Sequence, residues 1–115
     1  MNERDRSIIL ELKKRLPDDV RDHIQKVVAF GSRVRGGGSE DSDLDLLILV
    51  DRKAPEIEVK IEDVAYQVMW DHDFKPILSI KFFTESGYLN LLREGFSFYK
   101  NIEREGVSLW KRRFN

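Results

Sequence analysis

The chain has 115 residues with 41% hydrophobic content, which is enough for one compact core and too little for two. Its 20 Lys and Arg residues nearly balance its 21 Asp and Glu residues, and a formal net charge of -1 argues against a chain drawn as a whole onto nucleic acid or anionic lipid. The absence of cysteine excludes disulfides and thiolate zinc sites, and no apolar run approaches the roughly 18 residues of a membrane span. We therefore expect a single cytoplasmic domain, residues 1–115, with no membrane partner.

The first third of the chain predicts a helix, a strand and a turn. Apolar residues at helical spacing indicate an amphipathic helix from about Arg4 to Arg15, which the following proline ends. A β-branched run followed by glycine predicts a buried strand near Lys26 to Phe30. From Ser32 to Arg35 we expect a short helical turn, and the glycines at 36–38 end it and give the loop its freedom.

The rest of the chain predicts three strands and three helices. The expected strands, each recognised from its apolar residues, are Leu44 to Val50, Pro76 to Phe83 and Val107 to Trp110. The expected helices run from Pro55 to about Trp70, from the Tyr88 region to Gly95, and from Phe96 to Glu105. The large aromatic residues Trp70, Phe82, Phe83 and Phe96 are expected in the core, and KRRFN is expected to form a polar tail.

Two carboxylates head the second strand. Asp43 and Asp45 are two residues apart, so their side chains leave the same face with Cβ atoms about 6.6 Å apart. At that separation and an effective dielectric near 20, the two charges repel by about 2.5 kcal/mol, and a shared divalent cation reverses this cost. Carboxylate oxygens without cysteine or a nearby histidine favour Mg²⁺ or Mn²⁺ over zinc.

A glycine and a serine form the other half of the predicted site. Gly31 follows the first strand and allows a ligand to approach the backbone. The N–H groups of the next turn and the hydroxyl of Ser32 can both donate hydrogen bonds to that ligand. Arg33 and Arg35 are equally compatible with phosphate contacts and with ordinary solvated turn positions. If the two strands lie side by side, this turn and the aspartates face one cleft, which suits a metal-bound nucleoside triphosphate.

The pattern Gly31, Ser32, Arg35, Gly36, followed by Ser42, Asp43, Leu44 and Asp45, resembles the GSxxRG...SDxDL signature of the nucleotidyltransferase superfamily typified by DNA polymerase beta. The chain is most similar to the minimal nucleotidyltransferases, which are small prokaryotic single-domain proteins. The resemblance implies an α/β (α+β) fold with a small mixed β-sheet flanked by helices, like the polymerase beta palm.

The same resemblance implies an enzyme that transfers a nucleoside monophosphate from a nucleoside triphosphate, such as ATP, to an acceptor hydroxyl. Gly31 and Ser32 would hold the β- and γ-phosphates, and the catalytic residues Asp43 and Asp45 would ligate two Mg²⁺ ions. A chain this short has little surface to enclose an acceptor, so we expect a protein acceptor, or a partner or second copy that completes the cleft.

One position departs from the superfamily pattern. A third carboxylate usually stands on a later strand beside the first two, but PILSIKFF carries Ser79 and Lys81 on its polar face. An earlier strand start would bring Asp73 into place, with Asp71 close by. Without a third carboxylate the chain would bind nucleotide and metal while transferring slowly or not at all, and Lys81 would hold a phosphate by its charge.

Two alternatives to an independent enzyme remain open. Members of the resembling family often pair with helical HEPN-type toxins, and in that reading the chain is a catalytically weak, nucleotide-binding antitoxin partner. The other alternative is a small-molecule modifier akin to aminoglycoside nucleotidyltransferases, which normally carry an additional helical domain for the acceptor. A helical HEPN-like neighbouring gene would favour the first of these two alternatives.

Overall fold

A four-stranded sheet forms the centre of the computed structural model, which describes residues 1–36, 39 and 41–111. In the order β3-β2-β1-β4, its strands are β1 Ile24–Phe30, β2 Leu44–Val50, β3 Leu78–Thr84 and β4 Val107–Lys111. Strand β1 runs antiparallel to β2 and β4, whereas β2 and β3 are parallel. The sheet is therefore mixed, which confirms the predicted fold class.

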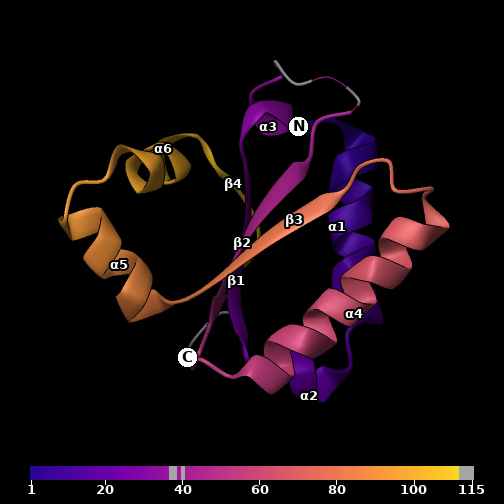
Figure 1. Ribbon diagram of the computed structural model, residues 1–115, viewed down its shortest axis with the longest axis horizontal. Coiled ribbons are helices and arrows are strands. Elements are labelled where there is room, and N and C mark those ends of the chain that lie inside the picture. Colours follow the sequence, from indigo (N-terminus) through magenta and orange to yellow (C-terminus); the bar gives the residue numbers. More distant parts are fainter. Residues whose placement is uncertain (37–38, 40, 112–115) are drawn as a thin grey trace.

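Helices cover both faces of this sheet (Figure 1). They are α1 Glu3–Arg15, α2 Asp18–Arg21, α3 Ser32–Arg35, α4 Pro55–Asp71, α5 Glu85–Arg93 and α6 Ser97–Glu105. Helices α1 and α4 pack on one face, and α5 and α6 lie on the other (Figure 1). Because α4 is the crossover between β2 and β3, these two strands can be parallel neighbours. Among the described residues, every helix is too short or too polar to cross a membrane.

The alternation of side chains along β2 decides which face carries the predicted site. Leu46 and Ile48 belong to the larger core under α1 and α4. Leu47 and Leu49 belong to the second core, with residues of α5 and α6. Since side chains two apart share a face, Asp45 lies on the side of the sheet that α5 and α6 cover.

The structure adds one helix to the sequence prediction and moves several element boundaries. The four-residue helix α2 follows Pro17 and was not expected. Strand β1 begins at Ile24 rather than Lys26, because Ile24 pairs with Val50 across an irregularity in the ladder. Strand β3 begins at Leu78 rather than Pro76, and a proline has no N–H to contribute to a ladder.

Two of the four aromatic residues expected in the core are exposed. Trp70 is 64% exposed and Phe96 is 51% exposed. Trp70 instead packs at the surface of α4 against Tyr66 and Phe74, with ring centroids 6.4 and 6.0 Å away. Four residues of the expected polar tail, 112–115, lie outside the described part of the chain, as do the glycines at 37 and 38.

Candidate active site

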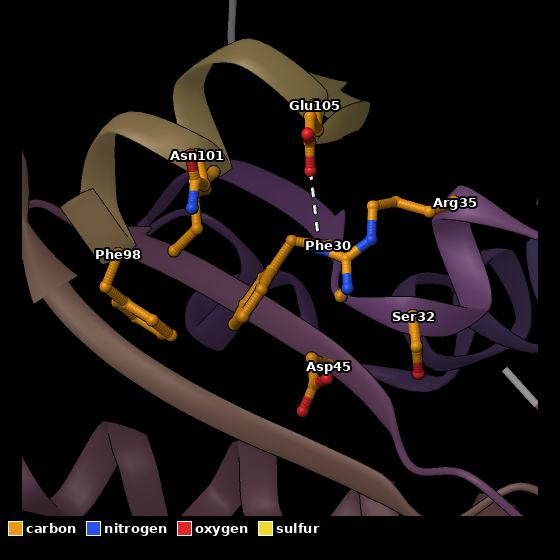
Figure 2. Close-up of a pocket in the computed structure, with 9 residues that line it drawn as sticks. Phe30, Ser32, Arg35, Asp45, Phe98, Asn101 and Glu105 are labelled. Carbon is orange, nitrogen blue, oxygen red and sulfur yellow. Dashed lines mark hydrogen bonds and ion pairs between the residues drawn. The ribbon is translucent and has the colours of Figure 1, made fainter. Parts of the chain in front are cut away.

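A cavity of about 320 Å³ opens between α6 and the point where β1 ends and β2 begins (Figure 2). Its lining includes Gly31, Ser32 and Arg35 from the first turn, Asp45 from β2, and Phe98 and Asn101 from α6. A volume of this size is within the range of small-molecule sites, about 300 to 1,000 Å³. The structure therefore brings three of the four predicted site residues, Gly31, Ser32 and Asp45, to one cavity.

Gly31 and Asp45 lie in direct contact. Phe30 and Asp45 are partners in the β1–β2 ladder, so the residue after Phe30 lies beside the Asp45 side chain. The backbone of Gly31 has φ of +88° and ψ of −168°, a combination that only glycine adopts readily. A Cβ atom at this position would lie 2.4 Å from Asp45 Oδ2. The absence of a side chain at Gly31 is what allows the turn and the carboxylate to share the cavity.

The carboxylate of Asp45 is perturbed by its surroundings. Burial raises the pKa of Asp45 above its ordinary value, and the negative charge of Asp43 raises this pKa further. Asp43 is exposed at the entrance to β2. Within the described part of the chain, neither carboxylate forms a side-chain hydrogen bond or a close ion pair. The pair is thus a negative site that the charge of Lys81 offsets only in part, and a cation would relieve it.

Strand β3 places a serine and a lysine beside this pair. Ser79 is the ladder partner of Asp45, and Lys81 is two residues further along on the same face. The charge of Lys81 acts on Asp45 by lowering its pKa, against the two larger effects. Strand β3 therefore presents a serine and a lysine beside Asp45, on the strand where the superfamily pattern predicts a third carboxylate.

Neither of the alternative aspartates reaches that position. Asp71 lies at the end of α4 and forms an ion pair of 2.6 Å with Arg15 of α1, on the opposite side of the sheet. Asp73 lies in the turn between α4 and β3, with φ of 57°, and β3 begins only at Leu78. The idea that an earlier strand start brings Asp73 into the ladder is wrong. Among the described residues, His, Cys, Asp and Glu side chains form no group of three or more around a possible metal position.

Arg33 has a structural role that the sequence did not reveal. Its Nη2 and Nε atoms bind the carboxylate of Asp5 at 2.8 and 3.0 Å, and the two side chains are only 9% and 1% exposed. Its Nη1 atom donates to the carbonyl oxygens of Ser39 and Ser42, at 3.1 and 3.2 Å. Arg33 therefore ties α1 and α3 to the loop that leads into Asp43.

A signal for this ion pair was present in α1. Asp5 shares the buried stripe of Ile8, Ile9 and Leu12, at the spacing of one helix face. An acidic residue on an apolar stripe needs a partner, because burial of an unpaired carboxylate is costly. Only the structure shows that the partner is 28 residues away.

Arg35 has a weaker partner at the rim of the cavity. Its Nη1 atom lies 3.3 Å from Glu105 Oε2, and the dashed line in Figure 2 marks this ion pair. The side chains are 54% and 37% exposed, and exposed pairs contribute little stability. Arg35 can therefore turn to an anionic ligand at low cost. Its partner on α6 could not be found from the sequence, because 70 positions separate the two residues.

Comparisons with known proteins place this chain in a protein family. A family model described as "Nucleotidyltransferase domain" matches residues 6–108. A Methanocaldococcus jannaschii protein named "Putative protein adenylyltransferase" is 31% identical over 106 residues, which cover 89% of this chain and 94% of that protein. A second protein from the same organism and with the same name is 35% identical over 75 residues, covering 62% of this chain and 75% of the relative.

Solved structures share the fold at low sequence identity. A toxin-antitoxin with AMP-PNP gives a TM-score of 0.57 at 17% identity, covering 94% of this chain and 74% of the matched chain. A complex of tri-AMPylated Shewanella oneidensis HEPN toxin with MNT antitoxin gives 0.55 at 14% identity, covering 97% and 74%. These likenesses extend over nearly the whole chain and bear on its fold.

Proposed function

Because this chain belongs to the nucleotidyltransferase family, we propose that its cavity binds a nucleoside triphosphate together with Mg²⁺ and transfers a nucleoside monophosphate to a protein hydroxyl. The observation that carries the proposal is the contact between the backbone of Gly31 and the carboxylate of Asp45, in the cavity that Ser32 also lines. A phosphate-binding turn and metal-binding carboxylates need this proximity to act on one ligand. ATP is the proposed substrate, since the two relatives are named adenylyltransferases.

The turn after β1 would hold the triphosphate. Gly31 presents backbone without a side chain, and the hydroxyl of Ser32 lines the same cavity. We assign these two residues to the β- and γ-phosphates. Arg35 stands at the rim, where its guanidinium can leave Glu105 for a phosphate oxygen and form two parallel hydrogen bonds.

The residues present fit a magnesium ion bound with its nucleotide. Asp43 and Asp45 supply oxygen ligands, and the charge of Asp43 opposes the charged form of Asp45. Mg²⁺ is commonly held by one or two carboxylates plus substrate phosphates. When bound, the ion would neutralise charge on the triphosphate. Ser79 and Lys81 leave a second Mg²⁺ with fewer protein ligands than the superfamily pattern supplies.

In the proposed transfer, the acceptor hydroxyl oxygen forms a bond to the α-phosphorus as the bond from that phosphorus to the β-phosphate oxygen breaks. Pyrophosphate leaves, and the hydroxyl proton passes to water. Strand β3 presents Ser79 and Lys81 here, and neither is a carboxylate that could take this proton. We therefore expect a slow transfer that depends mainly on substrate positioning and charge neutralisation.

A protein acceptor is supported by the names of the two relatives, which are those of protein adenylyltransferases. It is supported further by a structural neighbour from a complex of a tri-AMPylated HEPN toxin with an MNT antitoxin. We propose a HEPN-type protein as the partner. A second candidate function, in which the chain neutralises such a partner by binding and transfers little or nothing, is favoured by the serine and lysine at the third-carboxylate position.

The experiment that tests the proposal is label transfer from α-³²P-ATP with Mg²⁺ to a HEPN-type protein of the same genome. We expect label on the partner with wild type and none with Asp43→Asn/Asp45→Asn. Asp41→Asn, which removes an exposed carboxylate from the same loop, is the matched control and should transfer normally. A stable complex without label supports the second candidate. Equal labelling by the double variant contradicts the assignment of the carboxylates.

A further inference from the structure

The cavity has two chemically different ends. Ser32 and Arg35, from the turn after β1, line one end, and Asp45 lies below them (Figure 2). On the opposite side, α6 contributes Phe98 and Asn101, and Phe98 lies against Phe30 (Figure 2). The first end offers the positive charge of Arg35 and the hydroxyl of Ser32, while the second offers aromatic surface and an amide. A ligand that fills the cavity therefore needs an anionic part and a flat, hydrogen-bonding part.

Phe98 presents a fixed and partly uncovered ring. It meets Phe30 at a centroid distance of 5.8 Å and Tyr99 at 5.1 Å, edge to face in both cases. Despite these two contacts, 44% of Phe98 is exposed. The neighbouring rings hold the side chain in place, and part of its remaining surface lines the cavity. A held aromatic ring loses little conformational entropy when a planar ligand stacks on it.

Asn101 presents its amide nitrogen to the same end. Arg104 Nη2 donates a hydrogen bond of 2.7 Å to Asn101 Oδ1. A guanidinium has no acceptor, so this bond determines which side of the amide is oxygen and which is nitrogen. In Figure 2 the amide nitrogen lies on the side of Phe98 and Phe30. Asn101 can therefore donate to an acceptor atom of a ligand that lies against Phe98.

We propose that the α6 wall of the cavity is a nucleobase subsite, in which the base stacks on Phe98 and accepts a hydrogen bond from Asn101. This inference rests on the proposed function, because the triphosphate at Gly31 and Ser32 directs the rest of the nucleotide along the cavity. Phe98 supplies affinity for any base, since every base has a stacking face. Asn101 orients the base by a ring nitrogen or carbonyl oxygen.

The chain contains a matched control for this role. Phe96, which caps the same helix, is an aromatic residue with 51% of its surface exposed and does not line the cavity. If exposed aromatic side chains on α6 acted only through packing or general stickiness, Phe96 and Phe98 would behave alike. A nucleobase subsite requires that they differ.

The test compares two ligands that share the phosphates and differ in the base. Calorimetry in Mg²⁺ measures the Kd of AMP-PNP, a nonhydrolysable ATP analogue, and of inorganic tripolyphosphate. We expect Phe98→Ala to weaken AMP-PNP about 10- to 100-fold and to leave tripolyphosphate within about twofold. Asn101→Leu should weaken AMP-PNP by about 10-fold, and Phe96→Ala should change neither ligand. Phe98→Leu keeps the apolar bulk that packs on Phe30, so it should lose base affinity while α6 stays folded.

The outcomes distinguish failure of the nucleobase subsite from failure of the proposed function. If Phe98→Ala and Phe98→Leu leave the ratio of the two Kd values unchanged, the subsite is refuted while the phosphate site stands. The same holds if wild type binds tripolyphosphate as tightly as AMP-PNP. If wild type binds neither ligand, the proposed function fails, and the subsite fails with it.

Discussion

Replacing Gly31 with alanine is expected to damage both the stability of the chain and its metal-dependent nucleotide binding. The backbone at Gly31, with φ of +88° and ψ of −168°, costs about 1 to 3 kcal/mol for a residue with a side chain. The added Cβ would also lie 2.4 Å from Asp45 Oδ2, far inside van der Waals contact. The carboxylate must therefore turn away, and its oxygen leaves the position that it holds beside the turn.

Gly36→Ala separates these two effects. Gly36 has φ of +82° and no other atom within 4 Å of an added Cβ, so alanine there carries the backbone cost of about 1 to 2 kcal/mol without the contact. Denaturant unfolding should show a loss of this order in both variants. Calorimetry with Mg²⁺ and AMP-PNP should show at least a 10-fold loss of affinity in Gly31→Ala alone. Wild-type affinity in Gly31→Ala, or an equal loss in Gly36→Ala, would refute the reasoning.

Other substitutions test the supports of the site. Asp5→Ala leaves Arg33 buried without its carboxylate and should lower the free energy of unfolding by about 3 to 5 kcal/mol. Asp5→Leu/Arg33→Met should recover most of that loss. It should also raise the rate of hydrogen exchange at Ser39 and Ser42, whose carbonyl oxygens Arg33 binds in wild type. Unchanged protection of these two residues would contradict the role of Arg33 in holding the loop. Tyr88→Phe removes a 2.9 Å hydrogen bond to Glu103 and should cost about 1 kcal/mol. Burial and Glu103 raise the pKa of Tyr88 in the folded chain, so above about pH 10 this tyrosine ionises in the unfolded chain before it does so in the folded chain. Wild type should therefore lose additional stability as pH rises above about 10, and Tyr88→Phe should not. Asp45→Asn should raise the melting temperature of the metal-free chain, because burial and Asp43 both oppose the charge that it removes.

The parts of the fold that the sequence predicted are those with a local signal. The run before Gly31 and the run from Leu44 are apolar on both faces, and they form the two central strands of the sheet. Gly31 follows β1, and Asp45 is the second residue of β2. Their proximity could therefore be expected once the two strands were paired. Because Gly31 and Asp45 are close in sequence, the signature that contains both could be recognised without the structure.

The rest of the site depends on contacts between distant segments. The α6 wall comes more than 50 positions after Asp45, and nothing in the pattern around Phe98 or Asn101 points to a cavity. The Asp5–Arg33 pair spans two elements that touch only in the folded chain. The expected burial of Trp70 was wrong for a related reason, because the apolar residues of α4 continue onto a side of the helix where Tyr66 and Trp70 are 54% and 64% exposed.

The most direct test of the central claim is the Mg²⁺ dependence of nucleotide affinity. Calorimetry would measure the Kd of AMP-PNP in Mg²⁺ and in EDTA, for wild type and for Asp45→Asn. If Gly31, Ser32 and the two aspartates grip one metal-bound triphosphate, Mg²⁺ should tighten binding at least 10-fold in wild type and have almost no effect in Asp45→Asn. Equal affinity with and without Mg²⁺ in wild type, or an undiminished Mg²⁺ effect in the variant, would contradict the account.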